Sequence, residues 1–314
     1  MVLVISLRYH VVSLTAVFLA LALGVVLGAS GLSDRLLIAV SGERDSLSQQ
    51  VERLTAQRDV AAAEQRSADA FAAGVGPSVV AGRLNGARIV LLSAAGAQSV
   101  DRDVVIGLIK AAGGAVTGEV VLTDAVTDPA RADQLRELTS RLLPTGAQLP
   151  AASDPGSLAG GLLGGALLAR PNTPEVPPAQ VAAALAGLAE AGFVRPGAPP
   201  PPAQLAVILS GGSMTGVDAA DQAAVLARMA VELDRAGGGA VLAGRTGSAD
   251  AAGGVAVVRA DGAAAAALST VDDLQTAAGR IATVLALREQ ADGRAGKYGS
   301  GLGAQSSAPG VAAG

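Results

Sequence analysis

A single apolar run near the start of the chain sets the strongest constraint on its fold. Residues 11–32 carry no charged side chain and follow closely after Arg8. An α-helix rises about 1.5 Å per residue, so this run is about 33 Å long, enough to cross a hydrocarbon core about 30 Å thick. No second stretch of the sequence approaches it. We therefore predict one transmembrane helix within an N-terminal membrane anchor, residues 1–32.

A cleaved secretory signal is the alternative interpretation of the same residues. Signal peptides have apolar regions of about 7 to 15 residues that end at a small-residue cleavage site. The run is longer than that, and cleavage at its Ala20-x-Ala22 pattern would leave an apolar new N-terminus. Cleavage near Gly28 or Ala29 stays open. We favour a retained anchor, with the basic N-terminus in the cytoplasm and the large C-terminal part exported.

Residues 33–76 predict a long polar helix that serves as a coiled-coil-like stalk. A thin apolar seam recurs at alternating steps of three and four residues, as in coiled coils. The seam consists of Leu37, Val40, Leu47, Val51, Leu54, Ala61 and Ala68, interrupted by Arg44, Arg58 and Gln65. Either the seam forms a homo-oligomer, or a single helix packs it on its own domain. Gly74, Gly76 and Pro77 predict the end of the helix.

The composition excludes several classes of partner and site. Only 2% of the residues are aromatic although 50% are hydrophobic, so the core must be packed from Ala, Val and Leu. A net charge of −4 without basic clusters argues against a nucleic-acid partner, because phosphate neutralisation needs gathered Lys and Arg. The chain has no cysteine, which excludes disulfides, thiolate catalysis and cysteine metal ligands.

After the stalk, short apolar strands alternate with amphipathic helices, which predicts an α/β fold. We divide this part into a first α/β half (77–195), a proline-rich extended connector (196–203), a second α/β half (204–298) and a disordered tail (299–314). Strands are predicted at 88–93, 115–122, 205–210, 240–244 and 255–260. Helices are predicted near 101–112, 129–143, 179–191 and 280–290, with a buried helix around the glycine-rich residues 160–169.

The two halves begin with the same pattern. The strand RIVLLS at 88–93 and the strand LAVILS at 205–210 are both followed by small residues and then by a Val-Asp pair, with Asp101 and Asp218 at the start of the next helix. The following helices end in AGGAV and AGGGAV. Two copies of a strand, turn and helix unit are the simplest explanation. We therefore predict a duplicated, Rossmann-like α/β domain.

The strand-to-helix turns do not predict a nucleotide site or an enzyme. Neither turn has a dinucleotide or P-loop glycine pattern, and Asp101 and Asp218 place negative charge where a phosphate would sit. Arg245 is a candidate anion contact, although a lone loop arginine is more often solvated. The only histidine, His10, lies at the membrane edge. We therefore predict no catalytic residues and no stably bound cofactor.

The pair Asp272-Asp273 could bind a hard cation. Helix capping or solvation is the favoured interpretation, because no further oxygen ligands follow at the spacing of a calcium loop.

Several segments together resemble one known family. They are ISLRYHVVSLTAVFLALALGVVLG at 5–28, VERLTAQRD in the stalk, LAGRTGS at 242–248, STVDDLQTAAGRIATVLAL at 269–287 and KYGSG at 297–301. The chain resembles the mycobacterial and actinobacterial copper transport family MctB over nearly its whole length. The resemblance implies a cell-envelope protein that lowers intracellular copper, as an outer-membrane pore or an accessory to efflux. It supplies no motif of assigned copper ligands.

The residues give that role little direct support. Copper prefers thiolate, thioether and imidazole donors, and the chain has three methionines, one histidine and no cysteine. Met1 is the terminus and Met229 reads as helix core, so Met214 is the only plausible exported soft donor. Membrane β-barrels need many strands and aromatic girdles, which this sequence does not offer. Copper would therefore move through an oligomer, a partner or weak carboxylate guidance.

Two functions follow. The first is a copper transport or homeostasis protein of the cell envelope with copper as its transported ion, and the resemblance implies the outer membrane as an alternative to the inner one. The second is a membrane-tethered scaffold that binds other envelope proteins.

Overall fold

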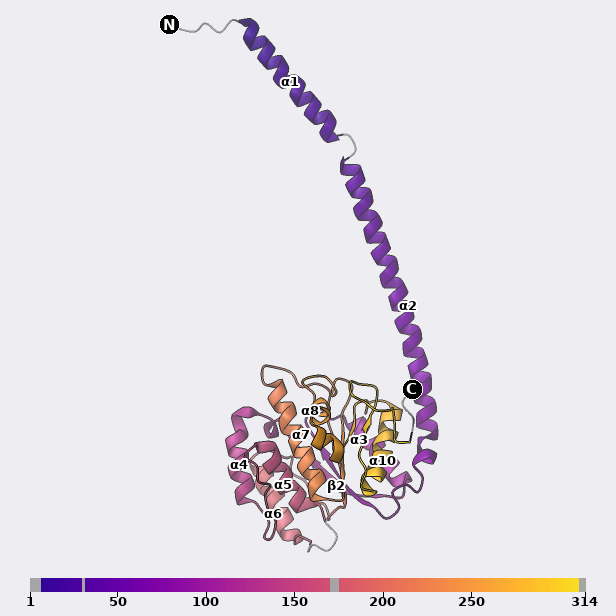
Figure 1. Cartoon of the computed structure of the whole chain (residues 1–314), viewed down its shortest axis with the longest axis vertical. Helices are drawn as coiled ribbons and strands as arrows, with labels where there is room; N and C mark the ends of the chain where they lie inside the picture. The colour runs from indigo at the N-terminus through magenta and orange to yellow at the C-terminus, as the bar shows by residue number, and fades with distance from the viewer. Residues whose placement is uncertain (1–6, 30–31, 170–174, 311–314) are drawn as a thin grey trace, which may run out of the picture. The chain divides into compact units, whose positions relative to one another are not determined.

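The computed structural model describes residues 7–29, 32–169 and 175–310, and it divides into two units, residues 1–67 and 68–314 (Figure 1). In the first unit, helix α1 (Leu7–Ala29) lies within the predicted anchor, residues 1–32. Its residues Leu7–Gly28 have a mean hydropathy of 2.5, none of them is buried, and they are the one candidate membrane span among the described residues. An isolated helix with exposed apolar side chains on every side is consistent with a lipid surrounding.

The second unit is a mixed α/β fold built on one six-stranded sheet. All paired strands are parallel, in the order β2-β1-β3-β4-β5-β6. The strands are β1 (Arg88–Ser93), β2 (Ala115–Val121), β3 (Leu205–Leu209), β4 (Ala240–Ala243), β5 (Ser269–Val271) and β6 (Lys297–Tyr298). Both predicted halves therefore contribute to a single sheet, with β1 and β3 paired side by side. The duplication itself stays a prediction.

Helices cover both faces of the sheet. They are α2 (Leu32–Val80), α3 (Ser99–Ala111), α4 (Ala132–Arg141), α5 (Pro155–Leu167), α6 (Pro178–Glu190), α7 (Ala219–Ala236), α8 (Gly254–Ala260), α9 (Gly262–Ala267) and α10 (Ala277–Ala291). Helices α4 to α8 share one core with Val90 and Leu92 of β1. Helices α3 and α10 and the end of α2 share the other with Ile89 and Leu91 (Figure 1). Alternate residues of β1 point to opposite faces, so one strand supplies both cores.

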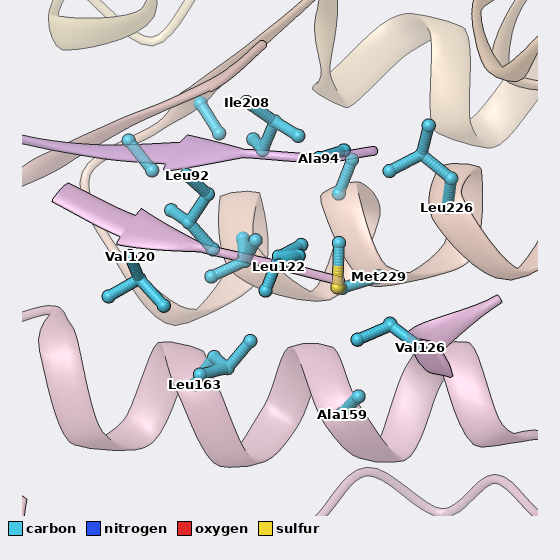
Figure 2. Close-up of a cluster of buried hydrophobic side chains, with 14 of the residues drawn as sticks. Leu92, Ala94, Val120, Leu122, Val126, Ala159, Leu163, Ile208, Leu226 and Met229 are labelled. Carbon is cyan, nitrogen blue, oxygen red and sulfur yellow. The ribbon is translucent and has the colours of Figure 1, made fainter. Parts of the chain in front are cut away.

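Helix α5 confirms the predicted buried helix and explains its glycines. Gly156, Gly160 and Gly164 recur every four residues and lie on one face of the helix. That face contacts the backbone of α7 so closely that a Cβ atom on Gly160 would lie 2.6 Å from the Met229 carbonyl oxygen. Both helices pack in the core shown in part in Figure 2. Glycine is required there because only a helix face without side chains permits this approach.

The end of the predicted stalk was wrong, because α2 continues to Val80 with Pro77 inside it. The reason is a tertiary contact. Gly76 lies against Ile281 of α10 and Leu108 of α3, and Val80 is fully buried. The free energy of this burial offsets the backbone hydrogen bond that Pro77 cannot donate. Leu37 and Val40 of the predicted seam lie outside the described side chains, and coiled-coil pairing of the stalk stays a prediction.

The proline-rich connector lies along the outer edge of β2. Just before the connector, the Arg195 amide donates to the Val121 carbonyl of β2 over 2.8 Å, and the Thr123 amide, just after β2, donates to the Phe193 carbonyl over 3.0 Å. Further along, Pro200 packs on Gly118 of β2. Prolines have no amide hydrogen to offer to another chain, so the segment shields an edge that would otherwise invite pairing.

Residues 255–260, predicted as a strand, form the helix α8 instead. Val255 and Val258 are buried three residues apart, which is helical spacing, and Arg259 points back to β5. The next strand of the sheet is β5, which is only three residues long. A short apolar run is compatible with either a strand or a helix, and packing against α7 favours the helix here.

The tail also differs from the prediction of disorder, because the structure places residues 299–310 against the domain. The Gly299 amide donates to the Ser306 carbonyl over 3.0 Å, and the Gln305 amide donates to the Lys297 carbonyl over 2.7 Å. Composition alone predicted disorder since Gly, Ser and Ala bury little surface. Here backbone hydrogen bonds beside β6, rather than side-chain burial, hold the segment.

Candidate functional site

The segments singled out by the sequence analysis converge at the carboxyl ends of the strands. The chain leaves β1 toward β2 on one side, while β3 pairs with β1 on the other, so the connections diverge between β1 and β3. In open parallel sheets, ligands bind at such a point, outside the carboxyl ends of the strands. This region is therefore the first place to look for a functional site.

The crevice between β1 and β3 is filled by the protein itself. A Cβ atom added to Gly211 would lie 3.2 Å from the Gly96 carbonyl oxygen, and the Ala94 amide donates to the Leu209 carbonyl over 2.8 Å. The two predicted small-residue turns thus pack on each other. Their glycines serve this close contact, and the geometry leaves no room for a nucleotide phosphate between them.

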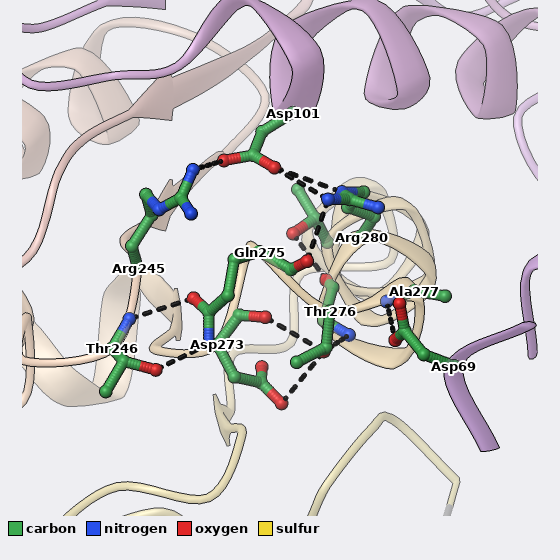
Figure 3. A network of polar contacts seen from close by, with 11 residues as sticks. Asp69, Asp101, Arg245, Thr246, Asp273, Gln275, Thr276, Ala277 and Arg280 are labelled. Carbon is green, nitrogen blue, oxygen red and sulfur yellow. Dashed lines mark hydrogen bonds and ion pairs between the residues drawn. The ribbon is translucent and has the colours of Figure 1, made fainter. Parts of the chain in front are cut away.

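Next to these turns, a buried carboxylate takes the place where an anionic ligand would sit. Asp101 lies in the first turn of α3 and is completely buried. Its two carboxylate oxygens accept from Arg245 over 2.8 Å and from Arg280 over 2.8 Å (Figure 3). Arg245, predicted as a solvated loop residue or an anion contact, is paired with this carboxylate. By contrast, Asp218 precedes α7 without a side-chain capping bond.

A polar network continues from this cluster to the start of α10. The Thr246 amide donates to Gln275 Oε1 over 2.9 Å, and Thr276 Oγ1 accepts from the Gly279 amide as the helix cap (Figure 3). Asp69 of α2 accepts from the Ala277 amide over 2.5 Å. A carboxylate at a helix N-terminus is favourable, so this bond ties the last turns of α2 to the domain.

Asp272, half of the predicted cation pair, is used as a structural ion pair. Its carboxylate binds Arg259 over 2.6 Å, and both side chains are almost fully buried. The Ser300 and Gly301 amides donate to the same carboxylate over 2.9 and 2.8 Å. Arg259 also donates to the Tyr298 and Leu302 carbonyls. The turn at 299–301 thus wraps around the carboxylate, so Asp272 is neither a helix cap nor a solvated side chain, the two roles favoured from the sequence.

Asp273, beside this ion pair, is a buried acid whose carboxylate is not fully hydrogen-bonded. Burial, and then the nearby charge of Asp272, raise its pKa to about 6, while a hydrogen bond from Thr276 opposes the shift. Its Oδ1 atom is buried without a hydrogen-bond partner. The described residues contain no group of three His, Cys, Asp or Glu side chains suited to hold a metal ion. A hard-cation site at Asp272 and Asp273 therefore has no ligand set.

Several hollows of the described residues lie outside this network, and two of them bear on function. A groove of about 450 Å³ runs between α6 and the connector, lined mainly by Ala, Leu, Val and Pro with Glu119 and Arg195. A small cavity of about 10 Å³ lies beside the turn after β1, and both Met214 and Met229 line it. Met229 is fully buried, as predicted for helix core, whereas Met214 is half-buried at the edge of the same core.

Comparison with known proteins decides the family. Residues 4–309 match the family described as "Copper transport outer membrane protein, MctB". The chain belongs to the MctB family. It is 43% identical over 309 residues to the copper transporter MctB of Mycobacterium tuberculosis, covering 96% of this chain and 98% of that protein. The copper transporter MctB of Mycobacterium leprae is 39% identical over 316 residues, with the same two coverages.

The MctB motifs noted in the sequence have structural roles in this fold. In LAGRTGS, Gly244 lies against Ser248 and Ser210, and Arg245 binds Asp101. In the long motif after β5, Gly279 lies against Asp273 and Arg280 binds Asp101. The motif segments are thus brought to one edge of the sheet, where they pack and pair with each other.

The structure therefore brings some of the predicted site residues together and leaves others apart. It joins Arg245 to Asp101 and Arg280, which lie 144 and 35 residues away in the sequence and carried no common signal. Met214 and Met229, which lie 15 residues apart in the sequence, line the same small cavity. His10 stays on the exposed surface of α1. The signal that could have indicated the ion-pair cluster is the position of Asp101 and Arg245 in the segments that follow β1 and β4, two strands of one parallel sheet.

Proposed function

We propose that this MctB family protein is a cell-envelope copper transport protein that lowers intracellular copper. The observation that carries the proposal is the match of the family over residues 4–309, because it includes the apolar helix, α2 and the whole α/β unit. The relatives named copper transporter MctB align over 96% of the chain. Copper is accordingly the transported species and no stably bound cofactor is needed.

The mechanism we propose is accessory handling of copper at a membrane rather than catalysis. Two buried carboxylates at the carboxyl edge of the sheet are used in ion pairs, Asp101 with Arg280 and Asp272 with Arg259. One candidate span per chain, within the described residues, does not enclose a channel. A copper pathway across the membrane would therefore need several copies or a partner efflux protein.

We further propose that the N-terminus is cytoplasmic and that the α/β unit lies outside the cytoplasm. The unit would be anchored through α1 to a membrane of the envelope, the inner one or, as the family description suggests, the outer one. Arg8 precedes the apolar helix, which agrees with the excess of positive charge on cytoplasmic flanks. The membrane partner of this topology is α1, whose side chains are exposed along its length.

Homo-oligomerisation through α2 completes the proposal. Leu47, Val51 and Leu54 are more than half exposed and follow the four-three spacing of a coiled-coil seam. The leucine and valine side chains on this stripe expose apolar surface to water in a single chain. Association of two or more copies would bury that surface and is therefore favoured. An oligomer would also gather several α1 helices, as a shared pathway requires.

The test is a gene deletion complemented by variants. We expect a deletion strain to be copper-sensitive and to hold excess copper, measured by elemental mass spectrometry of washed cells. The full chain should restore tolerance, and a chain without residues 1–31 should not. A deletion strain with unchanged copper tolerance and copper content would contradict the proposal.

A scaffold that binds other envelope proteins is the second candidate. The groove of about 450 Å³ between α6 and the connector is the observation in its favour, since its apolar lining and its size suit a ligand or peptide. Unchanged copper tolerance together with a cell-wall or division defect in the deletion strain would favour this function.

A further inference from the structure

The two methionines of the folded unit lie 15 residues apart in the sequence and share one cavity. Met214 is in the turn after β3, and Met229 is in the middle of α7. Both line the cavity of about 10 Å³, together with apolar residues and two threonines. Figure 2 shows the Met229 sulfur among Ala94, Leu122 and Val126, which also line it. A single thioether does not make a metal site, but two methionines that line one cavity offer a pair of thioether donors.

We propose that Met214 and Met229 together bind one Cu(I) ion. The inference rests on the proposed copper function and names the site at which the ion is held. Thioethers are soft donors that select Cu(I), whereas Cu(II) favours nitrogen and oxygen ligands. The chain has no cysteine and only one histidine, so methionine sulfur is the soft donor that the α/β unit offers.

The surroundings of the pair suit a monovalent soft ion. The hydroxyl groups of the two lining threonines are already engaged, because Thr123 donates to the Gly192 carbonyl over 2.6 Å and Thr127 donates to the Asp124 carbonyl over 3.3 Å. Oxygen donors therefore do not define the site. The volume of about 10 Å³ is comparable with the space one water molecule occupies, so one small ion fits.

The two donors differ in exposure, which gives the site an entrance. Met229 is fully buried on α7, and α7 is held by its close contact with Gly160 of α5. Met214 is half-buried in a turn, with its amide donating to the Ala252 carbonyl over 2.8 Å. The ion would reach Met214 from solvent and then bind the fixed Met229. Two neutral donors hold a cation weakly, which suits a protein that passes copper on.

The experiment is an anaerobic Cu(I) titration of the full-length chain in detergent against a chromogenic Cu(I) chelator. We compare the wild type with Met214→Leu, Met229→Leu and the double variant, because Leu and Met exchange with little change in packing. Leu226→Ile, which alters the same cavity lining without removing sulfur, is the matched control. Thermal unfolding checks that each variant folds.

We expect one Cu(I) per wild-type chain, at least a tenfold loss of affinity in each single variant, and no binding in the double variant. The control should bind like the wild type, and X-ray absorption should show sulfur next to copper. Equal binding by the wild type and the double variant would overturn the site, and so would no binding by the wild type. A copper-tolerant deletion strain would overturn the proposed function separately, because the titration does not depend on the cell.

Discussion

At the scale of single residues, buried carboxylates hold the carboxyl edge of the sheet together. Asp101 pairs with Arg245 and Arg280, and Asp272 pairs with Arg259. A buried charge without its partner is costly, whereas a fully bonded pair is close to neutral for stability. The main effect of these pairs is therefore to determine which loops contact one another. Their net contribution to the free energy of folding is small.

Asp101→Asn is expected to destabilise the protein. The change leaves the two arginine side chains facing a neutral amide, and loss of one partner of a buried pair costs about 3 to 5 kcal/mol, reduced here to about 2 to 4 kcal/mol because Arg245 is partly exposed. Urea unfolding of the wild type and the variant measures the difference. Glu137→Gln, which removes an exposed ion pair to Arg141, is the control and should change stability by less than about 0.5 kcal/mol. Equal losses in both would contradict this role of Asp101.

Asp273→Asn is expected to stabilise the protein at neutral pH. Burial and Asp272 raise the pKa of Asp273 to about 6 from 3.8 in the ordinary state, so the folded state disfavours the ionised form. The contribution of Asp273 to the free energy of unfolding is therefore fully present below about pH 4 and is lost as the pH rises through about 6. One pKa unit corresponds to about 1.4 kcal/mol, so the variant should gain about 1 to 3 kcal/mol at pH 7.5 relative to its difference at pH 4.

Unfolding free energies of the wild type and Asp273→Asn, measured at several pH values between 4 and 7.5, test this sign. The difference between the two proteins is compared because other acids titrate in the same range. A gap that stays constant, or that favours the wild type more as the pH rises, would refute the interpretation of Asp273.

At the scale of elements, close helix packing replaces the aromatic residues that the composition lacks. Helix α5 places glycines against the α7 backbone, and α2 places Gly76 against α10 and α3. With few large side chains, dispersion contacts and burial must come from short distances between backbones. The same packing positions α7 and therefore Met229.

Gly160→Ala is expected to destabilise the domain by about 1 to 3 kcal/mol, as overpacking does in a close-packed core. The new methyl group would lie 2.6 Å from the Met229 carbonyl oxygen and 2.8 Å from the Glu232 Cβ atom. Thermal or urea unfolding measures the change. Gly107→Ala on the exposed side of α3, where a Cβ atom meets nothing within 4 Å, is the matched control. It should stabilise by about 0.5 to 1 kcal/mol, since alanine is the better helix former. Similar effects of both would show that the contact is not tight.

At the scale of the whole molecule, the proposed oligomer depends on α2 and the proposed membrane anchor on α1. The stripe of Leu47, Val51 and Leu54 is exposed in a single chain. Replacing all three by Ser is expected to convert the oligomer into monomers, because the seam loses its apolar side chains. Light scattering of the detergent-solubilised full chain measures the mass. Val60→Ser, at an equally exposed position beside the seam, should leave the mass unchanged; a monomeric wild type would refute the oligomer.

Retention of α1 is a further prediction at this scale. The mature protein from native cells should start before Ser30 and fractionate with membranes, because the apolar helix is long enough to span. N-terminal sequencing and protease accessibility on intact cells give the result. A mature chain that begins beyond Ser30 and is recovered in soluble fractions would show a cleaved signal.

The sequence by itself determined the features that depend on neighbouring residues. The apolar helix, the strands at β1 and β3, the helix after each, and the burial of Met229 follow from local length and periodicity, which act over one or two turns. The family also follows from the linear order of residues.

Only the tertiary structure decided the features that depend on distant partners. Residues 255–260 form a helix because they pack against α7 and because Arg259 pairs with Asp272. Helix α2 continues beyond Pro77 because Gly76 packs against α3 and α10. Backbone hydrogen bonds beside β6 hold the tail. Asp101 and Arg245 meet only when β1, β3 and β4 are neighbours. The free energy of these contacts comes from burial and charge pairing across the fold, and it outweighs the small local preferences that a sequence window reports.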